Sequence, residues 1–559
     1  MYIKVTKSAG HSYIQLAESF RDESGKPRQR VLSTLGRVDE TGGQVDSILN
    51  ALLRAKGRTA DEPQIEFESA LSLGDVWALH RLWQEVGFDQ LSRVFRKARY
   101  TTAVEHAVRV MVFNRLCDPD SKLGVLRWLQ TVSIPEVDVS SLTHQHLLRS
   151  MDALMDHQEA VEEVVAQQLR PMVDQDLSLV FYDLTTIGVE GHSDLDGDVR
   201  HYGMSKEGLI ARQFMLGVVQ TAEGLPIYHE VFDGNQAEAP TLLPTLEKVL
   251  ARFPHIRRLI IVADRGLLSL DNIEALQAIK LDGGRTLEFI LAVPARRYGE
   301  FLEILTQFQA KVADQAQETI DETSWQGMRL VVAHNPIRAK EQTEWRKVQI
   351  KDLEGKAEQW AGKLDSQDGG TKHRGRKLSD SGAKARFYHE VKEAHLAKII
   401  KIDMKSDLFT YDIDEKALKQ AELVDGKLML VTNVTDLTPK EIVQRYKSLA
   451  DIERGFKVLK SEIEIAPVYH RLPQRIRAHA MICFMALILY RVMRTRLQMA
   501  KSNLSPERAL AQLKRIHRHQ IKVNNQPLAG TPTLTKEQSD LLGALTLKKP
   551  TKKEQLSLL

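Results

Sequence analysis

The stretch LSLVFYDLTTI, residues 177–187, predicts a β-strand with a carboxylate in its middle. Leucine, valine, phenylalanine and isoleucine give it apolar bulk, and Thr185 and Thr186 also favour β-structure. Asp183 interrupts this apolar run. A charge buried in an apolar setting is costly unless a partner compensates it. The strand therefore raises the question of whether Asp183 meets an arginine, backbone N–H groups or a bound cation.

The pattern downstream of this strand predicts a mixed α/β layer. Two β-rich runs, 212–221 and 225–232, are separated by a turn at Glu223–Gly224 and predict a hairpin. The next stretch, APTLLPTLEKVLARF, predicts a helix opened by a proline, and RRLIIVADRG predicts an apolar strand. They are followed by SLDNIEALQAIK, a helix that Ser269 would cap, and TLEFILAVP, another strand. Alternation of this kind is typical of a sheet covered by helices.

Two further carboxylates share features with Asp183. Asp264 comes at the end of the apolar strand LIIVADRG, where α/β sheets place functional groups, although Asp-Arg-Gly is also an ordinary turn. A capping box at Thr438-Pro-Lys-Glu predicts the start of a long helix running to Ile463. At about 100° per residue, Glu453 falls within the apolar stripe of that helix, so it faces the protein body unless its carboxylate reaches water at the edge.

Three inward carboxylates without a histidine or cysteine cluster favour a hard divalent cation. Mg²⁺ or Mn²⁺ takes oxygen ligands and keeps water molecules for substrate phosphates. Two such ions can activate a water or a 3′-hydroxyl on one side of a phosphodiester and stabilise the leaving oxygen on the other. We therefore expect two ions held by Asp183, Asp264 and Glu453.

Composition is that of a globular protein of several structural units. The chain has 559 residues, 43% hydrophobic and 27% charged, with a formal net charge of +4. Its two cysteines argue against a disulfide framework and a cysteine-ligated metal. The start has no apolar signal region, and the longest apolar run, 480–490, is too short to span a bilayer and predicts a core helix. The expected location is therefore the cytoplasm, with no membrane partner.

Local basic runs and changes of pattern divide the chain. Basic runs at 371–377, 513–522 and 547–553 suit phosphates or a solvated surface. We expect a β-rich N-terminal unit at 1–60, an α-helical domain at 61–175 and the first part of an α/β core at 176–294. A β-rich inserted subdomain at 295–437, with a mobile basic loop at 365–384, is expected next, then a helical second part of the core at 438–500 and a tail at 501–559.

The order strand-Asp183, hairpin, strand-Asp264, insertion, helix-Glu453 resembles the DDE transposases of bacterial insertion sequences. The branch is the IS-four superfamily, whose signature is Y-x2-R-x3-E-x6-K. Tyr446, Glu453 and Lys460 match it, whereas Leu449 stands at the arginine position, which puts one phosphate or structural contact in doubt. Other matching stretches span roughly 100 to 495: NRLCDPDSKL, HYGMSKEG, GLPIYHEVFDGNQAE, ADRGLLS and DGKLMLVTN.

The resemblance implies an RNase H-like mixed sheet with a β-rich insertion, and it implies roles for single residues. Asp183, Asp264 and Glu453 correspond to the catalytic, metal-binding triad. Tyr446 and Lys460 match positions that contact DNA phosphates. Lys206 and Arg265, in two of the matching stretches, are further candidates for DNA contact. An insertion-domain tryptophan stacks on a flipped base in relatives, and the choice among Trp325, Trp345 and Trp360 stays open.

The implied activity is Mg²⁺- or Mn²⁺-dependent cleavage at transposon ends followed by attack of the freed 3′-hydroxyl on target DNA. The partners would be double-stranded transposon ends, target DNA and a second copy of the chain in a synaptic complex on the bacterial nucleoid. Residues 1–175 would recognise the terminal inverted repeats, with help from the basic tail. Two alternatives remain: an inactive protein that only binds element ends, and a stand-alone RNase H-like metal nuclease.

Overall fold

The computed structural model forms two compact units. It describes residues 1–37, 42–57, 65–100, 103–173, 178–191, 195–205, 208–256, 258–263, 270–280, 287–312, 315–368, 378–523 and 526–550. One unit holds residues 1–71 and 517–533, and the other holds 72–516 and 534–550.

The first unit consists of two small sheets and one helix. Strands β1 (Tyr2–Ser8), β2 (His11–Arg21) and β3 (Pro27–Arg37) form an antiparallel sheet, which α1 (Gly42–Ala55) follows in the chain. These elements occupy the range predicted as a β-rich N-terminal unit. Strand β4 (Ile65–Ser72) joins a second sheet with β16 (His517–Val523) and β17 (Gln526–Gly530), so the two ends of the chain contribute to one sheet.

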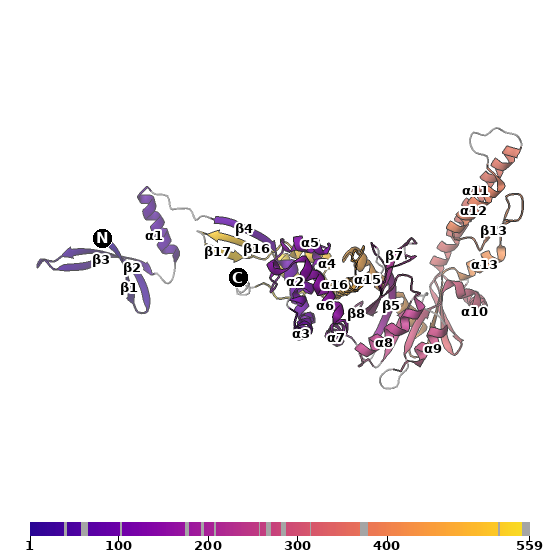
Figure 1. Ribbon diagram of the computed structural model, residues 1–559, viewed down its shortest axis with the longest axis horizontal. Helices are drawn as coiled ribbons and strands as arrows, with labels where there is room; N and C mark the ends of the chain where they lie inside the picture. Colours follow the sequence, from indigo (N-terminus) through magenta and orange to yellow (C-terminus); the bar gives the residue numbers. More distant parts are fainter. Residues whose placement is uncertain are drawn as a thin grey trace. The chain divides into compact units, whose positions relative to one another are not determined.

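The second unit is organised around a nine-stranded mixed sheet (Figure 1). Its centre is β5 (Ser178–Gly188), which pairs antiparallel with β7 (Ile210–Thr221) and parallel with β9 (Leu259–Ala263). Strand β8 (Pro226–Asp233) completes the predicted hairpin with β7, and β10 (Glu288–Ala292) runs parallel to β9. The resulting core order, β8-β7-β5-β9-β10, is that of an RNase H-like sheet and confirms the predicted fold class.

Three strands extend this sheet beyond β10, and their position changes the expected limits of the insertion. Strands β11 (Thr319–Trp325), β12 (Met328–His334) and β15 (Lys427–Thr432) continue the sheet in the order β10-β15-β12-β11. All three come from the range 295–437 that was predicted to stand apart as a β-rich subdomain. Their apolar residues place them in the core: Leu330, Val331, Leu430 and Val431 are fully buried.

What lies between β12 and β15 is mainly helical, which corrects the β-rich description of the insertion. Helices α11 (Pro336–Asp368) and α12 (Asp380–Glu393) run side by side (Figure 1). In the described part of this range the strands are β13 (Ile400–Ile402) and β14 (Tyr411–Ile413), each of three residues, followed by α13 (Glu415–Val424). The predicted basic loop at 365–384 is shorter than expected, because both helices extend into it. Residues 369–377 lie outside the described residues.

Helices cover both faces of the sheet. One face packs against α14 (Pro439–Lys447), through a cluster that includes Phe181 of β5 and Ile442 of α14. Helices α8 (Leu242–Arg252), α9 (Leu270–Ala278) and α10 (Leu302–Val312) contribute to the larger cluster, which also holds Tyr182.

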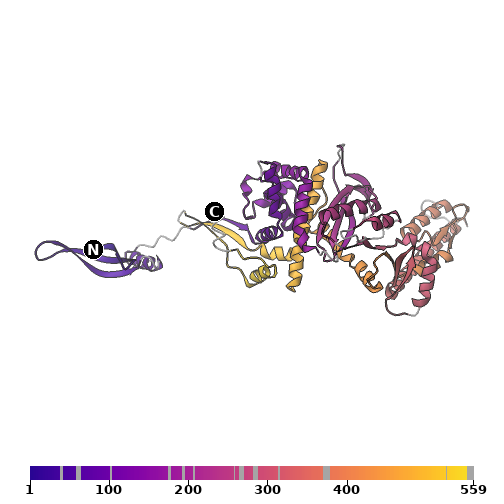
Figure 2. The same ribbon diagram turned by 90° about the horizontal axis from the view of Figure 1, so that it is seen from below.

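A helical block is assembled from two distant parts of the sequence. The described α-helices between residues 74 and 169 are α2 (Gly74–Val86), α3 (Leu91–Lys97), α4 (Val104–Cys117), α5 (Lys122–Leu129), α6 (His144–Asp156) and α7 (Gln158–Leu169). The long helix α16 (Pro473–Met499) packs against α4, α6 and β8, and Figure 2 shows this orange helix beside the purple ones. After it come α17 (Pro506–Leu513) and α18 (Lys536–Ala544).

Helix α16 contains the apolar run predicted as a core helix. It is long and apolar enough to cross a membrane, but 94% of its most apolar window is buried inside the protein. Its ring contacts agree with a core position, since Phe484 stacks on His229 of β8 at 4.4 Å between centroids. The run therefore serves as packing between the sheet and the helical block.

Lys122 lies buried in this block, and burial lowers its pKa to about 7, with repulsion from Arg115 as the next cause. Since the pKa in the unfolded chain is about 10.4, the unfolded state binds more protons than the folded state between these values. The free energy of unfolding should therefore rise with pH from about 7 to about 10, by on the order of 4 kcal/mol.

We expect Lys122→Met to stabilise the protein at neutral pH and to flatten this rise, as measured by thermal unfolding midpoints at several pH values. Lys97→Met, at an exposed position of α3, is the matched control and should leave the slope unchanged. An unchanged slope in Lys122→Met would show that the ammonium group keeps its charge at no cost.

Candidate active site

Asp183 lies on the central strand of the sheet. Strand β5 alternates its side chains between the faces, so Asp183 shares the face of Phe181, the side covered by α14. Its exposed fraction is 8%, and the backbone N–H of Leu184 donates to Oδ1 of Asp183 at 2.7 Å. One of the partners considered from the sequence, a backbone N–H group, is therefore present at this carboxylate.

The neighbouring strand β9 ends beside this position. Its last residue, Ala263, pairs in parallel register with Tyr182, the residue that precedes Asp183. In the sequence, Ala263 is followed directly by Asp264 and Arg265, which lie outside the described residues. The pairing thus aligns the chain positions just before the two predicted acids.

The predicted long helix is broken into two, which corrects the single helix expected over 438–463. Helix α14 begins with the predicted capping box at Thr438 and ends at Lys447, and α15 spans Ala450–Ser461. At the break the Ser448 hydroxyl donates to the carbonyl of Arg445, and the N–H of Leu449 bonds to the carbonyl of Tyr446, three residues back. A serine hydroxyl that bonds to a helix carbonyl in this way weakens or bends the regular pattern, and a bond to the third residue back tightens the turn.

The apolar stripe predicted for this segment is nevertheless present. Ile442 and Leu449 are buried in the cluster of α14, and Phe456 and Leu459 are buried in the larger cluster. Leu449, the residue at the signature's arginine position, is only 7% exposed, so it is part of the core here.

Helix α15 lies against β5, the strand of Asp183. It carries the backbone of Glu453, whose side chain lies outside the described part of the chain. The structure thus brings the backbone positions of two predicted acids onto elements that touch.

Helix α15 approaches β7 and α16 closely at Gly455, which the sequence analysis did not predict. A β-carbon at Gly455 would lie 2.8 Å from Nε2 of Gln220 in β7 and 3.1 Å from Nη2 of Arg491 in α16. Gln220 pairs with Phe181 and is fully buried, and neither polar atom of its side chain has a hydrogen-bond partner among the described residues. The available sequence signal was the glycine itself, since glycine inside a helix usually has a packing reason.

The other predicted site residues fall at separate places. Tyr446 is half-buried at the end of α14, and Lys460 is half-buried in the last turn of α15. Lys206 lies outside the described residues, next to β6 (His201–Met204). Among the described side chains no group of three or more histidine, cysteine, aspartate or glutamate residues forms a metal cluster, and this search leaves out Asp264 and Glu453.

The three candidate tryptophans differ in exposure. The Trp325 ring packs on Phe301 at 5.3 Å between centroids. Trp360 packs among the aromatic rings of the insertion, 6.1 Å from Phe387. Trp345 on α11 is 53% exposed and is the one of the three that presents its ring to solvent.

We expect Gly455→Ala to bring none of the gain that alanine normally gives inside a helix, about 1 kcal/mol, because its methyl group meets Gln220 and Arg491. Gly355→Ala in α11, where the β-carbon meets nothing within 4 Å, is the matched control and should show that gain. Urea unfolding of both variants makes the comparison. An equal gain in both would mean that α15 is not seated closely on β7.

Comparison with known families agrees with this geometry. The family described as "Transposase DDE domain" matches residues 174–489, which include β5, β9 and α15. A second family, "IS1634 family transposase, N-terminal domain", matches residues 3–64. No curated protein matches the chain. Because the first match covers more than half of the sequence, the chain belongs to the DDE transposases of bacterial insertion sequences.

Proposed function

We propose that this protein binds the terminal inverted repeats of an insertion sequence and catalyses metal-dependent DNA cleavage and strand transfer. Membership of the family implies DNA transposition and DNA binding. The observation that carries the finer proposal is the buried carboxylate of Asp183 on β5, with the end of β9 on one side and α15 against the same strand.

The strand pairing supports a shared site for the two aspartates. Tyr182 and Ala263 are paired neighbours, and each proposed acid follows one of them directly in the chain. A trans peptide keeps consecutive Cα atoms 3.8 Å apart. Each proposed acid is therefore the next residue in the chain after one of two paired strand positions.

The donor set fits a hard divalent cation. Asp183, Asp264 and Glu453 would supply carboxylate oxygens, the ligands that Mg²⁺ and Mn²⁺ prefer. A bound pair of such ions would activate the attacking water or hydroxyl and stabilise the leaving oxygen of the phosphodiester. The limited exposure of Asp183 would help to keep bulk water from that carboxylate.

Other side chains would bind the DNA. We assign phosphate contacts near the cleaved end to Tyr446 and Lys460, with Arg265 and Lys206 as further candidates. The N-terminal sheet is proposed to take part in recognition of the terminal repeats, within residues 1–175. Its basic side chains at Lys4, Lys7 and Arg21 are exposed, and phosphate contacts of this kind supply much of the affinity for DNA. A homodimer would hold both element ends in a synaptic complex.

We expect Asp183→Asn, Asp264→Asn and Glu453→Gln each to reduce end cleavage by more than about a hundredfold, since even outer-shell changes around a metal cost about 10- to 100-fold. Binding to the element's own ends should remain nearly intact. The measurements are an excision assay on an element with its native ends, Mg²⁺-dependent joining of a precleaved end to a plasmid, and a gel shift on the same ends.

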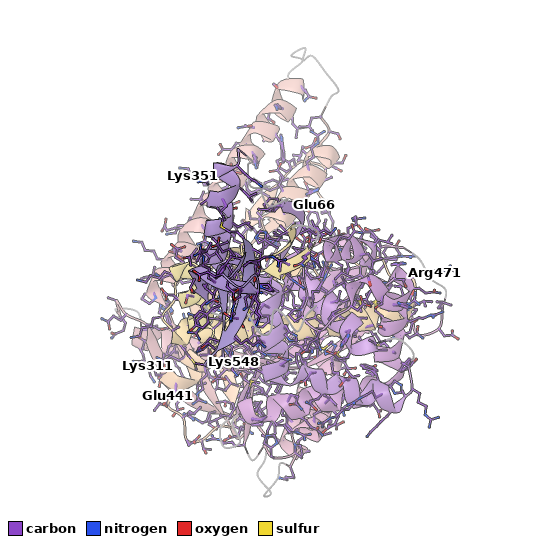
Figure 3. The ribbon with its side chains drawn as sticks, turned by 90° about the vertical axis from the view of Figure 1, so that its left-hand side faces the viewer. Glu66, Lys311, Lys351, Glu441, Arg471 and Lys548 are labelled. Atoms are coloured by element: carbon purple, nitrogen blue, oxygen red, sulfur yellow. The ribbon has the colours of Figure 1, made fainter. Side chains whose placement is uncertain are left out.

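Glu441→Gln is the matched control for Glu453→Gln. Glu441 is exposed (labelled in Figure 3), and its carboxylate accepts from the backbone N–H of Thr438 at 2.8 Å. Glutamine keeps this capping contact, so cleavage should stay at the wild-type level. Excision by Asp183→Asn would show that this carboxylate has a structural role. If the wild-type protein cleaved DNA without joining ends, it would be a nuclease. If the wild-type protein bound the ends without cleaving or joining them, it would be an inactive end-binding protein.

Trp345 is our choice for the residue that stacks on a DNA base, because its ring is exposed. We expect Trp345→Ala to weaken binding of the cleaved end by about tenfold, in line with a stacking contribution of about 1–3 kcal/mol, without lowering the unfolding temperature. Trp360→Ala should instead lower the unfolding temperature, because that ring packs against Phe387 and Phe409. Equal end binding by wild type and Trp345→Ala would reject the assignment.

A further inference from the structure

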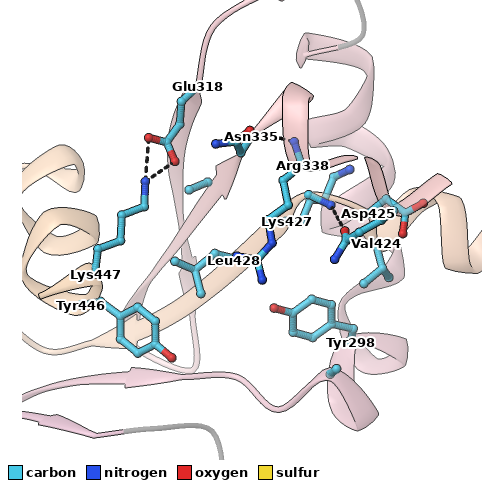
Figure 4. A pocket seen from close by; sticks show the side chains of 14 residues that line it. Tyr298, Glu318, Asn335, Arg338, Val424, Asp425, Lys427, Leu428, Tyr446 and Lys447 are labelled. Carbon is cyan, nitrogen blue, oxygen red and sulfur yellow. Dashed lines mark hydrogen bonds and ion pairs between the residues drawn. The ribbon is translucent and has the colours of Figure 1, made fainter. Parts of the chain in front are cut away.

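A cavity of about 270 Å³ lies where the insertion joins the sheet, and Tyr446 is the one lining residue to which the proposed function already gives a role. Figure 4 shows its walls, which come from the end of α14, the start of α11 and the turn into β15. Its polar lining residues are Tyr298, Glu318, Asn335, Arg338, Gln342, Asp425, Lys427, Tyr446 and Lys447.

Both acidic side chains of the lining are already neutralised. Glu318 accepts from Nζ of Lys447 at 2.6 Å, and Asp425 accepts from Nη1 of Arg346 at 2.8 Å. The Thr343 hydroxyl also donates to Asp425, at 2.8 Å. These pairs leave the cavity without a carboxylate free to neutralise a further cation.

Two cations of the lining form no ion pair with a carboxylate among the described residues. Arg338 makes no ion pair there, and Figure 4 shows its side chain extending toward the space between the Tyr298 and Tyr446 rings. Lys427 is 8% exposed and donates to the amide oxygen of Gln309 at 2.5 Å. Burial lowers the pKa of Lys427 to about 8, even though Asp425 acts in the opposite direction.

The two amides of the lining also present donors. The Asn335 side-chain oxygen accepts from the N–H of Arg338 at 3.0 Å, and the Gln342 side-chain oxygen accepts from the N–H of Gly426 at 2.7 Å. With both oxygens engaged, the NH₂ groups remain to serve a ligand. A guanidinium, an ammonium and two amide donors around one cavity suit an oxyanion rather than a cation or an apolar group.

We propose that this cavity binds a backbone phosphate of the transposon-end DNA and that Arg338 supplies its main cationic contact. The inference rests on the proposed function. The signature helix has leucine at position 449, buried among apolar residues, so no guanidinium can come from there. Arg338 on α11 lines the same cavity as Tyr446 of α14 and would provide that charge from the insertion instead.

The test uses the full chain and duplex DNA of the element's end, with single phosphates replaced one at a time by neutral methylphosphonates. We expect Arg338→Gln to weaken end binding about tenfold and to reduce the slope of log affinity against log salt by about one. One methylphosphonate position should weaken wild-type binding to the same extent and have no further effect in Arg338→Gln. Lys340→Gln, at an exposed position of the same helix outside the cavity lining, is the matched control.

Two results would overturn the phosphate site. The first is unchanged end binding and salt slope in Arg338→Gln. The second is that, at every methylphosphonate position, the loss of end affinity adds to the loss caused by Arg338→Gln. Either result would leave the proposed function standing as long as Asp183→Asn still abolishes cleavage. Absence of metal-dependent cleavage and joining by the wild type would instead reject the proposed function, whatever Arg338→Gln does. Arg338→Lys distinguishes the charge of Arg338 from its hydrogen-bonding geometry. Lysine keeps the positive charge, so the wild-type salt slope should return, but it cannot make the bidentate contact of a guanidinium with phosphate.

Discussion

The parallel pairing of β5 with β9 is the constraint on which the candidate site depends. Parallel strands end at the same edge of a sheet, so pairing Tyr182 with Ala263 aligns the positions that precede Asp183 and Asp264. The antiparallel hairpin β7–β8 then occupies the other side of β5 and brings Gln220 beneath α15. A slip of one residue in β5 would turn Asp183 to the opposite face, away from α14 and α15.

Much of the core could be predicted from the sequence because its signals are local. The apolar run of β9, the turn at Glu223–Gly224 and the capping box at Thr438 each specify their element through a few adjacent residues, and all three occur as expected. The fold class followed from their order. Asp183 lies on its predicted strand and the backbone of Glu453 on a helix, whereas Asp264 lies outside the described residues.

Other features depend on contacts between distant residues, which no local pattern contains. The break after Lys447 coincides with the bond from the Ser448 hydroxyl to the carbonyl of Arg445, whereas the amphipathic period alone predicted a continuous helix. Strands β11, β12 and β15 have ordinary strand composition, so only their pairing shows that they extend the core sheet. The closeness of Gly455 to Gln220 likewise joins residues more than 200 positions apart in the sequence.

The central position of α16 has a consequence for incomplete chains. This helix supplies one continuous apolar surface to both β8 and the helices of residues 74–169, which are synthesised long before it. A product that stopped before Pro473 would leave those partner surfaces open to solvent, and exposed apolar patches of that kind promote aggregation and degradation. Premature termination or frameshifting upstream of α16 would therefore leave the second unit without its central packing helix, and we expect no stable form of that unit to accumulate.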